Sequence, residues 1–418
     1  MTDKAASSHR LPAVFGSFTK GKRKVKLLWM SNAMHVKTGY GVQTNLFAPR
    51  LQKAGHDTAV LAYYGLEGGI INYNGVLCFP KAQHPYGMDV MNAHAHNFKA
   101  DAIFTLMDAW VVQAANMAPF KWIAWFPVDH DTLPPKVRDA ITLANYRIAM
   151  SKHGLSETNK AGLDSYYVPH AVDTELYKPM GKTKAREILR LPKDAYIVGT
   201  VAMNKGQPSR KNIPAMIQAF AIFKQRHPEA IYYMHTQEGI GTDGLGGINI
   251  PEMCGILGLR YGTDVILPNA YNMMIGLNDE MMATLYSAMD VHLLASMGEG
   301  FGIPIIEAQA CGTPVIVGGW TAMPELVHSG QIIDKKDAEP LWTGIAAYQY
   351  IAKVGAIVEA MEAEYKKPSS KSKAREGIVQ NYDVKVAFEK NMLPTINEIE
   401  QRFLAENERW EKVAEARK

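Results

Sequence analysis

Residues 296–315 read Ser-Met-Gly-Glu-Gly-Phe-Gly-Ile-Pro-Ile-Ile-Glu-Ala-Gln-Ala-Cys-Gly-Thr-Pro-Val, and they follow an apolar strand candidate, Val291–Ala295. Pro304 suits the first turn of a helix, where its missing N–H is not needed. Gly312 suits the end of that helix, and the next strand candidate begins at Pro314. This stretch therefore predicts a strand, a glycine-rich loop, a helix and a second strand, which is the repeating unit of an α/β fold.

The loop in this stretch also indicates a chemistry. Gly298, Gly300 and Gly302 allow a ligand to approach the backbone closely, and the N-terminus of the following helix favours a phosphate. Glu299 lies in the loop and Glu307 about one turn into the helix, so both side chains can face one site. Carboxylates accept hydrogen bonds from sugar and ribose hydroxyls. Taken alone, the loop is equally compatible with a tight turn that carries a solvated glutamate.

The same alternation of strands and helices extends along the chain in two blocks. The strand candidates of the first block are Val25–Met30, Thr58–Tyr63, Ala102–Leu106, Trp122–Phe126 and Tyr146–Ala149. Those of the second block are Ile197–Ala202, Ile231–His235, Val265–Leu267, Val291–Ala295 and Pro314–Val317. Helix candidates are Gln43–Ala54, Ile213–Gln225 and Glu280–Ala288. Mostly apolar strands are typical of a parallel sheet covered on both faces, so we expect two successive α/β units divided near Tyr177–Lys184.

Both ends of the chain are rich in charge. Residues 1–24 form a basic leader that lacks the apolar core of a signal peptide. This leader is either a solvated tail or a contact for an anionic surface such as nucleic acid. Val384–Lys418 is rich in helix formers and predicts one or two long helices, whereas the polar segment Tyr365–Lys373 predicts an exposed loop.

The composition excludes several classes of protein. The chain has 418 residues and a formal net charge of +4, which is too balanced for a histone-like or polybasic protein. Hydrophobic residues make up 47%, an ordinary value for a globular protein. The three cysteines are far apart and form no CxxC pair, so we expect reduced thiols in a cytoplasmic protein and no metal site. No run of eighteen apolar residues occurs, and we therefore expect no stable membrane insertion.

Glu299 and Glu307, with Gly-Phe-Gly between them, resemble the E-x7-E signature of retaining glycosyltransferases with the GT-B fold, especially family 4. Residues 168–179 resemble the segment that precedes the second domain of these enzymes, with His170-Ala171 where Asn-Gly is usual. The resemblance implies two Rossmann-like parallel-sheet domains that face a cleft, with C-terminal helices closing the molecule. The domain division that it implies is 1–24 (basic leader), 25–180 (acceptor-binding), 181–383 (nucleotide-sugar-binding) and 384–418 (a helical segment packing back toward the first domain).

A cluster of cations in residues 204–212 suits a diphosphate. In the resembling enzymes an Arg and a Lys neutralise the leaving group, and Lys205 and Lys211 take these two positions here. Lys205 keeps the charge of the usual Arg but loses its bidentate fork, and Arg210 could compensate. The other interpretation is a solvated basic turn.

The first domain supplies the remaining candidates. Gly39 and Gly41 resemble the family's glycine-rich loop near the donor phosphates, although by themselves they would indicate only a turn. His130 follows a strand and matches a family histidine near the donor sugar, whereas a lone histidine is more often structural. Asp108 and Asp129 are candidates for binding an acceptor hydroxyl, and Asp108 is equally suited to cap a helix.

The resemblance also implies a mechanism. A nucleotide-diphosphate sugar, most simply a UDP- or GDP-sugar, would be the donor, with no metal or other cofactor. Lys205 and Lys211, together with the helix that begins after Gly302, would stabilise the leaving diphosphate. The roles of the other residues are ribose binding by Glu307, sugar binding by Glu299 with the backbone of Gly300, Phe301 and Gly302, and stabilisation of the oxocarbenium-like transition state by His130.

The acceptor is the least determined part. The start of the chain is similar to a bacteriophage-encoded subgroup, which would make a hydroxymethylated DNA base the acceptor and the host cytoplasm the location. A protein, lipid or small-molecule acceptor is the alternative. Two other hypotheses are a non-catalytic nucleotide-sugar-binding protein and another GT-B enzyme, such as a sugar-nucleotide epimerase or a phosphorylase.

Overall fold

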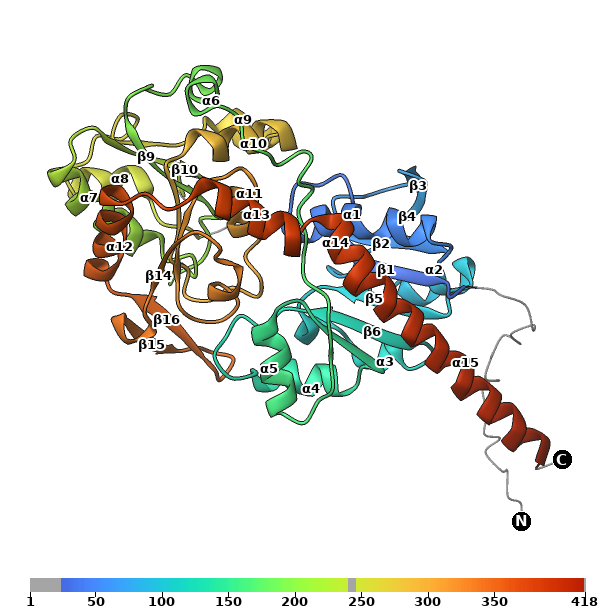
Figure 1. The fold of residues 1–418 in the computed structure, drawn as a ribbon. Helices are drawn as coiled ribbons and strands as arrows, with labels where there is room; N and C mark the ends of the chain where they lie inside the picture. The colour runs from blue at the N-terminus through green and yellow to red at the C-terminus, as the bar shows by residue number, and fades with distance from the viewer. Residues whose placement is uncertain (1–23, 240–245, 417–418) are drawn as a thin grey trace, which may run out of the picture.

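A computed structural model describes residues 24–239 and 246–416, with side chains up to residue 406 in the last helix. Two parallel sheets with helices on both faces lie next to each other (Figure 1). The basic leader, apart from Lys24, lies outside the described residues. The predicted fold class, two Rossmann-like domains in the GT-B arrangement, is confirmed.

The first sheet has eight strands among the described residues, in the order β3-β4-β2-β1-β5-β6-β7-β8. All neighbours pair in parallel except β3 and β4. The bounds are β1 Leu27–Asn32, β2 Thr58–Tyr64, β3 Ile71–Tyr73, β4 Val76–Pro80, β5 Ala102–Leu106, β6 Lys121–Phe126, β7 Tyr146–Ala149 and β8 Tyr166–Tyr167. The strand order reverses between β1 and β5, and ligands bind at such a point in open parallel sheets.

The second sheet has six parallel strands in the described part of the chain, in the order β11-β10-β9-β12-β13-β14. The bounds are β9 Tyr196–Val201, β10 Ala230–His235, β11 Val265–Ile266, β12 Val291–Leu294, β13 Val315–Gly318 and β14 Gly330–Ile333. A hairpin that the sequence did not predict follows it, formed by β15 (Ala338–Trp342) and β16 (Tyr348–Ala352).

The helices cover both faces of each sheet. Alternate residues of β1 point to opposite faces, so Trp29 packs into one core cluster and Met30 into another. The helices around the first sheet are α1 Gly39–Lys53, α2 Met91–Phe98, α3 Ala114–Met117, α4 Pro135–Thr142 and α5 Lys152–Lys160, with the 3-10 turn η1 Ala109–Val111. Those of the second half are α6 Lys182–Leu189, α7 Ile213–Arg226, α8 Ile250–Ile256, α9 Ala270–Ile275, α10 Asp279–Ala288, α11 Ile303–Ala310 and α12 Val354–Lys366, with the 3-10 turns η2 Pro324–Leu326 and η3 Lys335–Asp337.

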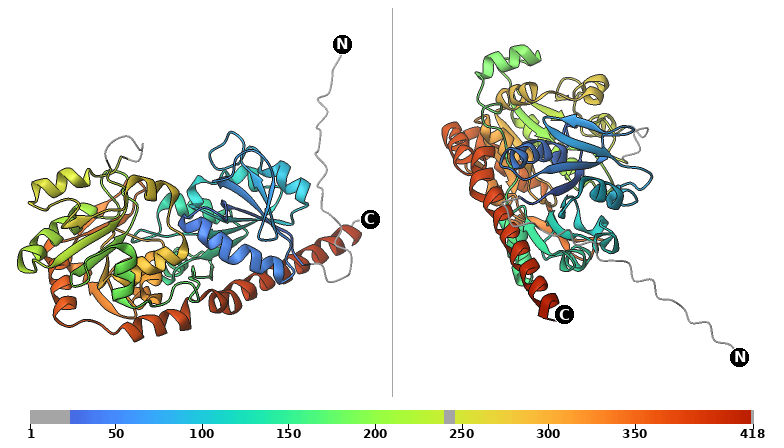
Figure 2. Two further views of the ribbon diagram at one scale, coloured as in Figure 1. Left: turned by 90° about the horizontal axis from the view of Figure 1, so that it is seen from above. Right: turned by 90° about the vertical axis from the view of Figure 1, so that its right-hand side faces the viewer.

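The chain crosses between the domains twice, at neighbouring places. Val172 on the way out forms a parallel β-bridge with Asp383 on the way back. The Asp383 carboxylate accepts a hydrogen bond from the Thr174 hydroxyl at 2.6 Å. The chain then runs along one side of both domains (Figure 2). Its elements there are α13 (Lys371–Asn381), α14 (Val384–Ala387), the π-helical turn η4 (Phe388–Met392) and α15 (Leu393–Ala416). Tyr166 donates a hydrogen bond to Glu398 of α15 at 2.9 Å, so this last helix packs on the first domain.

The structure corrects two local expectations. Tyr365–Lys373 is not one loop, because α12 runs to Lys366 and α13 begins at Lys371, with Ser370 capping it by accepting a hydrogen bond from the Lys373 N–H. Gly39 and Gly41 are not in a loop before a helix but in the first turn of α1, where the Thr38 hydroxyl accepts the Gly41 N–H. No helix in the described residues is long and apolar enough to span a membrane.

Candidate active site

The glycine-rich loop after β12 lies directly against the first domain. A Cβ atom at Gly298 would approach the Asp129 carbonyl oxygen closer than 3.0 Å, and one at Gly300 would do the same to Pro127. These two glycines therefore permit the two domains to touch. Gly302, with a φ of 109°, ends the loop as the N-cap of α11. At Gly39 a Cβ atom would lie 3.3 Å from Ile303, so the N-terminal turns of α1 and α11 meet across the interface.

Glu299 is held by two cations from the loop before α7. The Lys211 ammonium lies 2.5 Å from one carboxylate oxygen, and the Arg210 guanidinium lies 3.4 Å from the other. Burial opposes the charge of Glu299, which is 5% exposed, yet these cations keep its pKa below the usual value. Arg210 also donates to the Gly298 carbonyl. The loop therefore carries a charged network in which both oxygens of the Glu299 carboxylate face a cation.

His130 and Asp129 complete this network from the end of β6. The Asp129 carboxylate lies 2.7 Å from Nδ1 of His130 and 3.8 Å from the Arg210 guanidinium. Although burial raises the pKa of Asp129, the hydrogen bond to His130 and the charge of Arg210 bring it below its usual value. His153 Nε2 hydrogen-bonds to the His130 carbonyl at 2.7 Å. Since Nδ1 is held, the second ring nitrogen of His130 is the one that can contact a ligand.

The hairpin of β15 and β16 contacts the segment Asp129–Asp131, which follows β6. Asp131 pairs with Tyr348 of β16 through backbone hydrogen bonds of 2.8 and 3.3 Å. Its carboxylate accepts from the Tyr350 hydroxyl and the Lys335 ammonium, both at 2.5 Å. Gln349 donates to the Asp129 carbonyl at 3.3 Å. The hairpin was not predicted, and the signal for it was the run Tyr348–Ala352, which is rich in aromatic and branched residues and is followed by Lys353.

Asp108 lies next to this network at the end of β5. Burial and the nearby Asp129 charge raise its pKa to about 6, and the Tyr40 hydroxyl hydrogen-bonds to it. Asp108 precedes η1, but its side chain makes no capping hydrogen bond, so the helix-cap interpretation is wrong.

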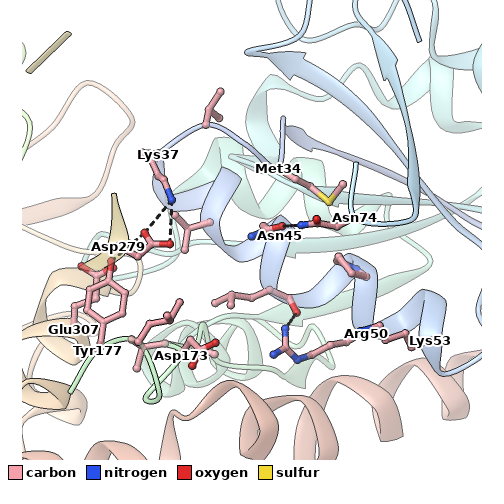
Figure 3. A pocket seen from close by; sticks show the side chains of 17 residues that line it. Met34, Lys37, Asn45, Arg50, Lys53, Asn74, Asp173, Tyr177, Asp279 and Glu307 are labelled. Carbon is pink, nitrogen blue, oxygen red and sulfur yellow. Dashed lines mark hydrogen bonds and ion pairs between the residues drawn. The ribbon is translucent and has the colours of Figure 1, made fainter. Parts of the chain in front are cut away.

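Glu307 faces a cavity of about 400 Å³ (Figure 3). The cavity lies between α1, the segment Ala171–Tyr177 that connects the two domains, and the second domain. The Glu307 carboxylate accepts a hydrogen bond from the Tyr286 hydroxyl at 2.7 Å. Burial raises its pKa to about 7. At the edge of the cavity Lys37 of the first domain forms an ion pair of 3.0 Å with Asp279 of the second. An ion pair between the two domains therefore spans the edge of this cavity.

Lys205 and Phe301 lie apart from the charged network. The Lys205 side chain is exposed, and no hydrogen bond or ion pair joins it to the other candidates within residues 24–239 and 246–416. Arg210 takes its place beside Glu299. The Phe301 ring is buried in the junction between the domains, 5.2 Å from the His170 ring, so only its backbone can serve a ligand. Burial lowers the pKa of His170 to about 3, which makes this unusual residue a neutral part of the junction.

The network described here has no arrangement typical of a metal site. Within the described residues no group of three or more His, Cys, Asp or Glu side chains is placed to hold a metal ion. The three cysteines are buried and unpaired.

Parts of the chain are similar in sequence to known proteins. Residues 264–380 match the family model described as "Glycosyl transferases group 1". A D-inositol 3-phosphate glycosyltransferase of Stackebrandtia nassauensis is 28% identical over 286 residues, which cover 63% of this chain and 61% of that protein. The match thus spans about three fifths of that relative's length.

Solved structures extend the likeness to both domains. The sucrose-phosphate synthase of Thermosynechococcus elongatus aligns with a TM-score of 0.69 at 16% identity, covering 92% of this chain and all of that one. Anabaena HepE, solved with UDP and glucose, aligns with a TM-score of 0.65 at 19% identity, covering 90% and 100%. Residues 264–380 are therefore similar to the group 1 glycosyl transferases, and they lie in a chain whose two domains have the GT-B fold.

Proposed function

We propose that this protein is a retaining glycosyltransferase that moves a sugar from a nucleotide-diphosphate sugar to an acceptor hydroxyl. The observation that carries the proposal is the network of Glu299, Lys211, Arg210, Asp129 and His130, which joins the two domains at the loop before α11. Its charges are suited to a diphosphate and a sugar held side by side.

Each group in this network has a role in the proposal. Arg210 and Lys211 stabilise the leaving diphosphate, with the N-terminus of α11 acting on the same charge. Glu299, released from part of its pairing when the diphosphate binds, accepts hydrogen bonds from the sugar. His130 contacts the sugar through its second ring nitrogen. Lys205 remains a predicted diphosphate contact that would require the 204–210 loop to move.

The donor would lie between the domains. Glu307 would accept hydrogen bonds from the ribose at the wall of the cavity, and the backbone of Gly39 and Gly41 would contact the phosphates at the first turn of α1. A UDP-sugar is favoured because HepE, on the same fold, binds UDP and glucose. A GDP-sugar is the alternative.

Retention is part of the proposal. Glu299 is paired with two cations and is therefore a poor covalent nucleophile. In a front-face mechanism the glycosidic C–O bond to the diphosphate breaks, the acceptor oxygen bonds to the anomeric carbon on the same face, and the acceptor proton passes to the departing phosphate. Closure of the domains would exclude water from this step.

The two domains have different roles in the proposal, divided at the boundaries predicted from the sequence. We propose that residues 25–180 bind the acceptor and residues 181–383 the donor, with 384–418 bracing the first domain. A hydroxymethylated DNA base, a bacteriophage source and a cytoplasmic location remain predictions. The alternatives are a protein, lipid or small-molecule acceptor, or a non-catalytic nucleotide-sugar-binding protein.

Product analysis tests the proposal. The protein would be incubated with UDP-glucose and a pool of hydroxylated acceptors, and the anomeric proton of the product would be followed by NMR. We expect a product with the α-configuration of the donor and none from Glu299→Gln. A β-linked product would refute retention, and an isomerised donor would indicate an epimerase. Binding without any turnover would indicate the non-catalytic alternative.

A further inference from the structure

Aromatic side chains gather at one edge of the first sheet, next to the charged network. Tyr63 is near the end of β2, and Tyr86 belongs to the loop that follows β4. Tyr40 lies in the first turn of α1, which follows β1, and Asp108 follows β5. Because β4, β2, β1 and β5 are consecutive in the sheet, their carboxyl ends place these four residues along one line. That line ends at Asp129, after β6.

The rings of Tyr63, Tyr86 and His84 lie together and are called here the tyrosine surface. The centroids of the Tyr63 and Tyr86 rings lie 5.5 Å apart with 65° between the ring planes, and the His84 ring lies 6.2 Å from that of Tyr86. Gln113 hydrogen-bonds to the His84 ring at 3.0 Å and fixes its orientation. Both tyrosine rings pack against the core cluster on one side and are only partly buried, so part of each ring is left for a ligand.

This surface differs in charge from the cavity near Glu307. The cavity is lined by three cations of the first domain, Lys37, Arg50 and Lys53 (Figure 3). In contrast, Lys81, at the start of the loop that carries Tyr86, lies 3.9 Å from the Glu67 carboxylate, and the charge of Arg210 acts on Asp108. Arg210 is already committed to Glu299 and Asp129.

The pairing of these cations with acidic residues limits the acceptor. A phosphorylated acceptor needs Arg or Lys at its phosphate, and a DNA strand needs several along its backbone. A neutral sugar needs instead an aromatic face for its C–H groups and carboxylate or hydroxyl groups for its hydroxyls. Tyr63, Tyr86, Tyr40 and Asp108 provide this second set, at the side of the network where the acceptor hydroxyl must arrive.

We propose that Tyr40, Tyr63, Tyr86 and Asp108 form an acceptor subsite for a neutral saccharide, with Asp108 and Tyr40 binding its hydroxyls. This inference rests on the proposed function, since it names the acceptor class of the same enzyme. A neutral acceptor would distinguish this chain from the relatives that are named for a phosphorylated inositol.

Acceptor-stimulated release of the nucleoside diphosphate tests the subsite. The nucleotide sugar that the wild type hydrolyses slowly would be mixed with methyl glycosides of glucose, mannose and galactose, with glucose 6-phosphate and inositol 1-phosphate, or with a 5-hydroxymethylcytosine oligonucleotide. Binding of the same compounds would be followed in parallel by saturation-transfer NMR in the presence of the diphosphate. Donor hydrolysis without acceptor reports the proposed function separately.

We expect a neutral glycoside to bind and to accelerate release. Tyr63→Leu and Tyr86→Leu should each raise its KM about tenfold and leave the donor KM unchanged. Tyr64→Leu is the matched control, because Tyr64 follows Tyr63 on β2, is exposed, and points to the other face of the sheet. The proposal is overturned if only the phosphorylated compounds or the oligonucleotide accelerate release. It is also overturned if neither leucine variant changes the acceptor KM, or if the binding of neutral glycosides is the same in Tyr63→Leu as in the wild type.

Discussion

Replacing Lys211 with methionine should destabilise the second domain strongly. Methionine keeps most of the length and apolar volume of the side chain but removes the ammonium that lies 2.5 Å from Glu299. The Glu299 side chain is only 7% exposed, so its charge loses its main partner in a buried place. Breaking such a buried pair costs about 3–5 kcal/mol. Because Arg210 stays 3.4 Å from the other carboxylate oxygen, we expect the lower end of that range.

The corresponding change in melting temperature is measurable. In a domain of about 200 residues, 1 kcal/mol lowers Tm by about 2–4 °C, so a loss of about 3 kcal/mol corresponds to about 6–12 °C. Differential scanning calorimetry at pH 7 without donor would measure it. Lys205→Met is the matched control, since this lysine is exposed and should change Tm by less than about 2 °C.

A double variant separates loss of the pair from loss of packing. Glu299→Gln combined with Lys211→Met removes the uncompensated charge, and it should recover a large part of the Tm lost by Lys211→Met alone. A Lys211→Met protein that melts within 1 °C of the wild type would refute the reasoning, as would a double variant that melts lower than the sum of the two single losses.

Three further predictions concern the interface and the buried acid. Gly298→Ala should reduce sugar transfer about tenfold or more in a steady-state assay, because its Cβ would force the domains apart, whereas Gly344→Ala, with nothing within 4 Å, should be silent. Tyr350→Phe should lower Tm by about 2–4 °C through loss of one hydrogen bond to the Asp131 carboxylate, and an unchanged Tm would show that the hairpin contact contributes nothing. Glu307 has a pKa raised by burial from 4.5 to about 7, so the folded chain holds a proton that the unfolded chain releases. The stability of the wild type relative to Glu307→Gln should therefore fall from about pH 4.5 to pH 7 and level off above, and a rise in that Tm difference over the same range would contradict the shift.

The sequence was sufficient to predict the repeated units of strand, turn and helix in the two domains. The apolar strands and the loop at 296–302 predicted two parallel sheets, because strand, glycine-rich turn and helix follow one another with few alternatives. It was also sufficient to bring Glu299, Lys211 and His130 to one place. That success came from the resemblance to a family rather than from spacing, since no local pattern relates His130 to a loop 170 residues later.

The parts that the sequence did not predict depend on contacts between distant segments. Lys205 was preferred over Arg210 on its position in a motif, whereas the structure turns Arg210 toward Glu299 and leaves Lys205 exposed. The hairpin of β15 and β16 bonds to Asp131 of the other domain, and no pattern near Tyr348 indicates that partner. The tyrosine surface likewise assembles from the ends of strands that are far apart along the chain.

The binding of a donor by the charged network is the central claim, and a panel of nucleotide sugars tests it most directly. Thermal shift and release of the nucleoside diphosphate would be measured with UDP-, GDP-, ADP- and dTDP-sugars, for the wild type, Lys205→Met and Lys211→Met. We predict that one donor stabilises the wild type and slowly loses its diphosphate, and that Lys211→Met abolishes both effects. If no nucleotide sugar binds, or if Lys211→Met binds and turns over the donor as the wild type does, the account is contradicted.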